Sequence, residues 1–322
     1  MTRVGVFWRK VWSNRTLLAR NRTRAVLVGS GGNTRELFRQ VNDAAHFHIA
    51  FAHFCDTKAL SESQVISWVQ EFVKSGSARV VVLDIRDAQI LPILSELYAL
   101  SFKGVQFVDQ NVIFEELNEY VALHRVNHAW LVENVSFPMH SMFNIVKRIF
   151  DLLIAIPLFI VSVPLYIPVL IALRRNARTG LSVQEYVGKN MKRIYLARFC
   201  IATTGNERST KLNRFISRYH LDKLPRLFSV IMGDLSLIGP RPEVSPSVEQ
   251  YNELIPYYTV RHFVTPGLIG LAQLHDDQVL SEVEGAQRQL AYDLFYMQHR
   301  SFAFDFKIVF RTVYAAISRV GA

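Results

Sequence analysis

The stretch that decides the fold runs from His220 to Glu243 and reads HLDKLPRLFSVIMGDLSLIGPRPE. It places a single acid, Asp222, before a short apolar segment and then returns to Arg241 between two prolines. Proline fixes its backbone φ angle, so this arginine is expected to lie in a rigid turn. The residue after Asp222 is Lys223, which puts a cation directly beside the acid.

Length, charge and cysteine content limit the possible classes of protein. At ~150 residues per domain, the 322 residues allow two domains, and half of the residues are hydrophobic. The net charge of +10 favours a polyanionic partner, such as nucleic acid, an anionic membrane face or a phosphorylated substrate. The two cysteines, Cys55 and Cys200, provide neither a disulfide framework nor metal-ligand spacing, so a reducing cytoplasmic environment is expected.

The beginning of the chain is strongly basic, with no acid in the first 35 residues. Apolar and aromatic residues alternate with these cations near helical spacing, which is typical of a helix lying at a membrane interface. A disordered basic tail and an organellar transit peptide fit the same composition. We therefore predict a basic amphipathic segment over residues 1–23.

An apolar segment without a charge extends from Leu152 to Leu173. As a straight helix of 22 residues it would be about 33 Å long, close to the ~30 Å thickness of the hydrocarbon layer. It contains three prolines, including Pro164, and both flanks are basic, with Lys147 and Arg148 before it and further arginines after it. Positive charge favours the cytoplasmic side at both ends, which predicts a broken, re-entrant helix over residues 144–173. A buried core helix is the alternative.

Strands and helices alternate in the first half of the chain. The predicted strands are 25–29, 48–54, 79–85 and 105–108, with helices at 35–41, 61–74 and 90–100 between them. Such alternation is typical of a mostly parallel, doubly wound sheet. We therefore predict a Rossmann-like α/β domain over residues 24–140.

The first turn of this domain, Gly29 to Thr34, resembles a dinucleotide-binding fingerprint. Thr34 occupies the place of its third glycine, and the nearest acid after the second strand is Asp56. A nucleotide site and a tight strand-to-helix connection both remain open, and the incomplete fingerprint favours the connection.

Several short blocks follow one another in the second half of the chain. They are Lys147-Arg148-Ile-Phe-Asp151 with Pro164, Gln184-Glu185, Val187-Gly188, Leu221-Asp222, Leu224-Pro225, Gly233-Asp234 through Pro242-Glu243, Pro266-Gly267, Asp293 to Tyr296 and Asp305 to Ile308. In this order, they resemble the bacterial sugar transferases, the monotopic polyprenyl-phosphate phosphoglycosyl transferases that initiate exopolysaccharide or glycoconjugate assembly. The resemblance covers residues 141–322, and it implies a mostly helical α+β, membrane-associated domain. The front unit also looks like the Rossmann-like module of the longer members.

The resemblance implies a function and a set of site residues. An aspartate attacks the diphosphate of a UDP-sugar and displaces UMP, and the phosphosugar then passes to polyprenyl phosphate, with Mg²⁺ offsetting the phosphate charge. The resemblance assigns catalysis to Asp222 and Lys223, and it assigns the metal to Asp222 as well. It assigns phosphate or substrate binding to Arg241, Arg218, Arg198 and Gln184. The residues that it assigns to the re-entrant helix are Lys147, Arg148, Asp151 and Pro164.

The resemblance also implies partners and a location. The expected partners are the membrane, polyprenyl phosphate, a nucleotide sugar, polysaccharide-assembly proteins and a second copy of the chain in a homodimer, without nucleic acid. The expected location is the bacterial inner membrane, facing the cytoplasm.

The chain departs from the family pattern in the phosphate-handling blocks. Lys223 replaces an expected glutamate, which reverses the local charge and disfavours Mg²⁺, although the lysine could itself pair with phosphate. Four expected cations are replaced by Tyr186, Cys200, Ser217 and Thr265, while Arg198 replaces a lysine. Nearby cations that could restore charge are Arg214, Arg218 and Arg226.

Three hypotheses follow from these patterns. The first is an active phosphoglycosyl transferase, and the second is a catalytically degenerate relative that acts as a binding partner or regulator in polysaccharide assembly. For the second, Asp222 could serve only as a helix N-cap ahead of Leu224-Pro225. The third is a nucleotide-dependent oxidoreductase that uses the front domain, and it fails on the incomplete glycine fingerprint.

Overall fold

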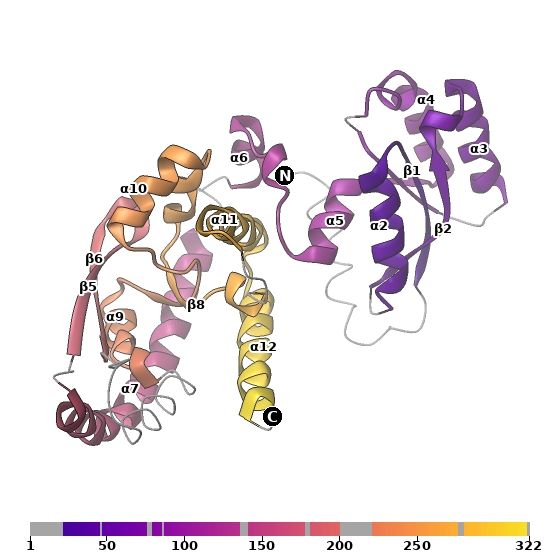
Figure 1. The fold of residues 1–322 in the computed structure, drawn as a ribbon. Helices are drawn as coiled ribbons and strands as arrows, with labels where there is room; N and C mark the ends of the chain where they lie inside the picture. The colour runs from indigo at the N-terminus through magenta and orange to yellow at the C-terminus, as the bar shows by residue number, and fades with distance from the viewer. Residues whose placement is uncertain are drawn as a thin grey trace. The chain divides into compact units, whose positions relative to one another are not determined.

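The computed structural model describes residues 22–45, 47–75, 79–85, 87–135, 141–177, 181–199, 221–275 and 280–320. The chain divides into two compact units, residues 1–119 and 120–322 (Figure 1). We predicted this boundary near residue 140. Residues 120–135 group with the second unit because they bond to its helix α11 (Glu282–His299). The Val121 N–H donates to the Ala291 carbonyl at 3.1 Å, and the Gln298 amide donates to Asn134 Oδ1 at 3.0 Å.

The first unit contains the parallel sheet predicted from the strand–helix alternation. Its strands are β1 (Thr23–Gly29), β2 (Ile49–Asp56), β3 (Val80–Leu83) and β4 (Gln106–Asp109), in the order β2-β1-β3-β4. Every pair of neighbours is parallel. The helices of the unit are α2 (Gly32–Asp43), α3 (Glu62–Lys74), α4 (Leu94–Ala99) and α5 (Gln110–Asn118), with 3-10 turns at Thr57–Ala59, Leu91–Ile93 and Leu100–Lys103.

Apolar residues cover both faces of this sheet. Val26 and Val28 of β1 point into one core with Val65 and Val69 of α3. Ala25 and Leu27 point into the other core, which Leu37 and Val41 of α2 complete. A parallel strand buried on both faces is a continuous apolar run, which explains why the β1 sequence AVLV lacks polar alternation.

The glycine turn after β1 is closed by side chains of the unit itself. Gly31 has a φ angle of 98°, in the left-handed region that favours glycine. Asp87 Oδ2 accepts hydrogen bonds from the Ser30 N–H at 3.2 Å and from its hydroxyl at 2.6 Å. The Thr34 hydroxyl donates to the Ser30 carbonyl at 3.1 Å. In a nucleotide-binding turn, such N–H and hydroxyl donors would bind phosphate. Here the Asp87 carboxylate already accepts the donors of Ser30.

The second unit is mostly helical. Its helices are α6 (His128–Asn134), α7 (Ser141–Ala177), α9 (Arg226–Met232), α10 (Ser245–Leu254), α11 and α12 (Phe302–Val320). Its 3-10 helices are η4 (Leu123–Arg125), η6 (Lys189–Met191), η7 (Leu221–Lys223), η8 (Tyr258–Phe263) and η9 (Ala272–Leu274). Its strands are β5 (Leu181–Val187) and β6 (Arg193–Phe199), which form an antiparallel hairpin, and β7 (Ser236–Ile238) and β8 (Gly267–Ile269), which pair in parallel.

Two glycines allow the β7–β8 pair to form. The Gly239 N–H donates to the Ile269 carbonyl at 3.0 Å, and the Gly267 N–H donates to the Pro240 carbonyl at 2.7 Å. A Cβ atom on Gly267 would lie 2.1 Å from the Gly239 nitrogen, so any side chain there would force the backbones apart. This close approach fixes the start of the turn that carries Arg241.

Helix α7 is the one helix in the described part of the chain that is long and apolar enough to cross a membrane, over Met142–Tyr166. Only 17% of its most apolar window is buried, and Leu153, Ile160 and Val161 are more than 60% exposed. Helix α12 adds an exposed stripe at helical spacing, formed by Phe306, Phe310 and Tyr314. Exposed apolar faces of this kind mark surfaces for contact with lipid or with another protein. Figure 1 shows α7 changing direction along its length, as expected of a helix with internal prolines.

Candidate functional site

Three polar side chains predicted to mark the membrane helix attach α7 to the rest of the second unit. Lys147 Nζ lies 2.5 Å from Asp305 Oδ2 of α12, and both side chains are 9% exposed. The Arg148 guanidinium donates to the carbonyls of Val230 and Ile231 at 2.5 and 2.6 Å. We call these bonds, together with those of Asp151, the helix-anchoring contacts.

Asp151 bonds to a strand that lies far along the chain. Its carboxylate accepts the Ser236 hydroxyl at 2.7 Å and the Leu237 N–H at 3.1 Å, both from β7. Pro164 lies farther along α7 and is exposed. The basic and acidic residues of this block therefore bond to α9, β7 and α12.

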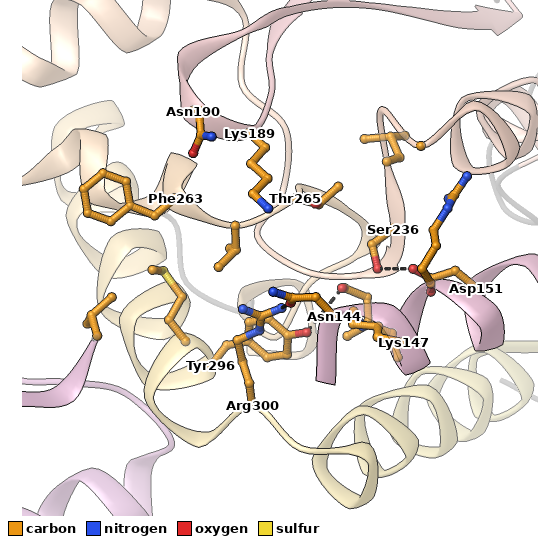
Figure 2. A pocket seen from close by; sticks show the side chains of 17 residues that line it. Asn144, Lys147, Asp151, Lys189, Asn190, Ser236, Phe263, Thr265, Tyr296 and Arg300 are labelled. Atoms are coloured by element: carbon orange, nitrogen blue, oxygen red, sulfur yellow. Dashed lines mark hydrogen bonds between the residues drawn. The ribbon is translucent and has the colours of Figure 1, made fainter. Parts of the chain in front are cut away.

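A cavity of about 350 Å³ adjoins the helix-anchoring contacts (Figure 2). Figure 2 shows Lys189 and Thr265 on one side of it and Asn144, Tyr296 and Arg300 on the other. The Arg300 guanidinium donates to Asn144 Oδ1 at 2.8 Å, so this cation already has a partner. Neither Asp222 nor Arg241 lines the cavity.

The predicted acid and three cations form a separate group at the start of α9. Asp222 and Lys223 lie on η7, directly before the helix. Burial lowers the pKa of Lys223, Arg241 lowers it further, Asp222 raises it and Arg226 again lowers it. Asp222 and Lys223 are neighbours in the chain, Arg226 begins the helix that follows, and Arg241 is near enough to affect the charge of Lys223. We call Asp222, Lys223, Arg226 and Arg241 the cation cluster.

Arg226 is held by an aromatic residue that replaces an expected arginine. Its guanidinium carbon lies 5.2 Å from the centre of the Tyr186 ring, and its Nη2 donates to the Tyr186 hydroxyl at 3.0 Å. That hydroxyl donates in turn to Gln184 Oε1 at 3.3 Å. Arg226 Nε is buried and has no hydrogen-bond partner within the described ranges. Tyr186 replaces an expected cation in the sequence, and in the structure another arginine, Arg226, lies against it.

The backbone of Arg241 is supported by a buried ion pair. Arg261 is 1% exposed; it donates to the Arg241 carbonyl at 3.0 Å and lies 2.8 Å from Asp293 Oδ2. Burial raises the pKa of Asp293 to about 7 against the opposite effect of Arg261. Arg241 itself is exposed. The structure thus fixes the backbone of the turn and leaves its arginine side chain accessible.

Two other predicted substrate residues lie on the β5–β6 hairpin, where Gln184 and Arg198 are both exposed. Gln184 is connected to the cation cluster through Tyr186. Arg218 lies outside the described residues, as do Arg214, Cys200 and Ser217.

Arg261 was missed because two partners of its guanidinium are distant in the sequence. The Arg241 carbonyl and Asp293 lie 20 and 32 residues away, and the nearer Tyr258 hydroxyl accepts another of its N–H groups. The one hint in the sequence was the family-like block from Asp293 to Tyr296. It drew attention to the acid of the ion pair but not to Arg261.

The residues around Asp222 do not fit a divalent metal ion. Magnesium prefers an octahedron of oxygen ligands that includes one or two carboxylates. In the described part of the chain there is no group of three or more His, Cys, Asp or Glu side chains that could hold a metal. Among the described residues that perturb Lys223, Asp222 is the one acid and the other two are arginines. A dication at this place would be repelled by three cations.

The family model of the bacterial sugar transferases matches residues 142–319. The chain is 29% identical over 296 residues to the UDP-N-acetylgalactosamine-undecaprenyl-phosphate N-acetylgalactosaminephosphotransferase of Aeromonas hydrophila, covering 85% of this chain and 68% of the relative. It is 29% identical over 203 residues to the UDP-glucose:undecaprenyl-phosphate glucose-1-phosphate transferase of Klebsiella pneumoniae, covering 59% and 44%. It is also 30% identical over 194 residues to the exopolysaccharide production protein PSS of Rhizobium leguminosarum bv. phaseoli, covering 54% and 96%.

Proposed function

The chain belongs to the bacterial sugar transferase family, and we propose that it transfers a sugar-1-phosphate from a UDP-sugar to polyprenyl phosphate. The Aeromonas and Klebsiella relatives are named for this class of reaction, with N-acetylgalactosamine and glucose as their sugars. The observation that carries the proposal is the placement of Asp222 beside Lys223, Arg226 and Arg241 in the unit that contains the apolar helix α7. This arrangement would bring a nucleophile and phosphate-binding cations together near lipid.

The proposed chemistry has two steps at one phosphorus atom. A carboxylate oxygen of Asp222 attacks the phosphorus that carries the sugar, and the bond to the bridging oxygen breaks as UMP leaves with the electron pair. An oxygen of polyprenyl phosphate then attacks the same phosphorus and releases Asp222. Arg241 and Arg226 provide planar donors that suit phosphate oxygens, and their charge stabilises the negative transition state.

The proposed location is the cytoplasmic face of the bacterial inner membrane, with α7 entering and leaving the same leaflet. The internal prolines of α7, its exposed apolar surface and the basic residues on both flanks support this topology. Single cysteines placed before Phe143 and after Arg178, in a chain whose own cysteines are replaced, should both react with a cytoplasmic thiol reagent. Labelling from opposite sides would show that the helix crosses the membrane.

For the first unit we propose a Rossmann-like module with a structural role. The parallel sheet with helices on both faces supports a doubly wound module, although its order β2-β1-β3-β4 is the flavodoxin-like variant of this architecture. The carboxylate of Asp87 at the Ser30 donors argues against a bound nucleotide, because it would repel a phosphate there.

The decisive test is UMP release by the purified chain in nanodiscs with polyprenyl phosphate. UDP-glucose and UDP-N-acetylgalactosamine are tried first, each with MgCl₂ and with EDTA. We expect UMP and a labelled lipid product, and neither from Asp222→Asn. If neither the natural chain nor Lys223→Glu releases UMP from either sugar nucleotide, the binding or regulatory role is supported instead. The names of the relatives point to the transferase.

A further inference from the structure

We propose that the cation cluster binds the diphosphate of a UDP-sugar without a divalent metal ion. This inference rests on the proposed function and concerns how the same site neutralises its substrate. It follows from the replacement of the expected glutamate by Lys223 and from the residues that surround this lysine in the structure.

The first argument is a balance of charge. Exchanging the expected glutamate for Lys223 changes the local charge from −1 to +1, a difference of +2. That difference equals the charge of one Mg²⁺ ion. With Lys223 protonated, three cations and one carboxylate give the cluster a charge of +3 − 1 = +2, which matches the two negative charges of a nucleotide-sugar diphosphate.

The second argument is the geometry of Arg226. Its contacts with Tyr186 restrict the guanidinium before any ligand arrives, because the ring lies 5.2 Å from its carbon and the hydroxyl accepts one of its N–H groups. Its Nε–H remains a buried donor without a partner in the described residues. A buried donor that lacks a partner costs free energy, which a phosphate oxygen within reach would recover. Arginine is suited to this task by its rigid fork of donors.

The third argument is the position of Lys223. This half-buried residue lies on η7, three residues before Arg226, which begins α9. Two cations thus lie within one turn of the chain beside the carboxylate of Asp222, so the cluster gains stability from an anion, whereas a dication would increase the repulsion.

Binding of UDP to the full chain in detergent tests the inference independently of turnover. Calorimetric titrations are run with EDTA and with excess MgCl₂. We expect dissociation constants within about threefold of each other, because a metal would add under ~0.7 kcal/mol. Lys223→Glu should weaken binding at least about tenfold in EDTA, a loss above ~1.4 kcal/mol, and should recover with MgCl₂.

The matched control is Lys192→Glu, which makes the same change of charge at an exposed position on the β5–β6 hairpin. It should bind UDP as the natural chain does, with and without metal. Arg226→Gln provides a second variant that keeps Lys223, and it should weaken UDP binding in EDTA. Thermal unfolding of each variant verifies that it is folded.

The outcomes separate the inference from the proposed function. If the natural chain binds UDP in EDTA but never transfers sugar, the proposal of a metal-free site is supported and the transferase proposal fails. If it transfers sugar but needs MgCl₂ to bind UDP, the transferase proposal stands and the inference is overturned. Absence of UDP binding under both conditions overturns the inference as well.

Discussion

The bonds of Arg148 lie near the end of α9 and the cation cluster lies around its start, and both regions contain basic side chains. At the end of the helix, Arg148 donates to two carbonyls, and nearby Lys147 meets Asp305 at 2.5 Å. At its start, Lys223 lies near two arginines and one acid. Cations that bond to a carboxylate or to carbonyls hold elements together, whereas cations held near each other leave capacity to bind an anion.

Removing one partner of a buried pair should have the largest effect. Asp305→Asn leaves the Lys147 ammonium buried without a counter-charge, and we expect a loss of about 3–5 kcal/mol in the free energy of unfolding. Denaturant unfolding in detergent measures it. Glu249→Gln, an acid-to-amide change at an exposed position of α10, is the control and should have little effect. A loss for Asp305→Asn as small as that of the control would show that the pair does not anchor α7.

A smaller effect is expected from pH at the buried residue next to Arg261. Burial lowers the pKa of His262 to about 4, and Arg261 acts in the same direction. The imidazole is therefore neutral when folded, and the unfolded chain takes up its proton first as pH falls below 6.5. The stability contributed by His262 is thus present above pH 6.5 and is lost between pH 6.5 and 4, by up to ~3 kcal/mol.

The measurement is the difference in unfolding free energy between the natural chain and His262→Gln at several pH values. A difference is needed because the pKa of Asp293 is raised to about 7, and its contribution changes with the opposite sign over the same range. A difference that stays constant from pH 7 to 4 would mean that the histidine titrates alike in the folded and unfolded chains.

The smallest effect on stability is expected in the cation cluster. Lys223→Met removes a half-buried ammonium from the vicinity of two arginines, so the free energy of unfolding should stay within ~0.5 kcal/mol or increase. UDP binding should nevertheless fall. Lys192→Met should change neither quantity, because that side chain is exposed on the hairpin. A clear destabilisation by Lys223→Met would place this lysine with the anchoring residues and remove the contrast between the two regions.

Much of the architecture could be predicted from local patterns. The alternation of apolar runs and helical segments predicted the parallel sheet, and the structure confirms it. The ordered blocks from Lys147 onward predicted the family, which the comparison confirms. Both signals depend on residues close together in the chain, where spacing alone determines which side chains share a face.

Partners distant in the sequence could not be predicted in the same way. The Asp151 carboxylate bonds to Ser236, 85 residues away, and no pattern close to Asp151 in the sequence points to that serine. Tyr186 was counted as a lost cation until the structure placed Arg226, 40 residues away, against its ring.

Local sequence is enough to identify the family, the apolar character of α7 and the exchange of an expected acid for Lys223. Which cations already bond to other groups, and which gather around Asp222, depends on the folded chain. The chemical type and charge of a side chain are local properties. Its pKa and its capacity to bind an anion depend on burial and on neighbours that chain folding brings from distant positions.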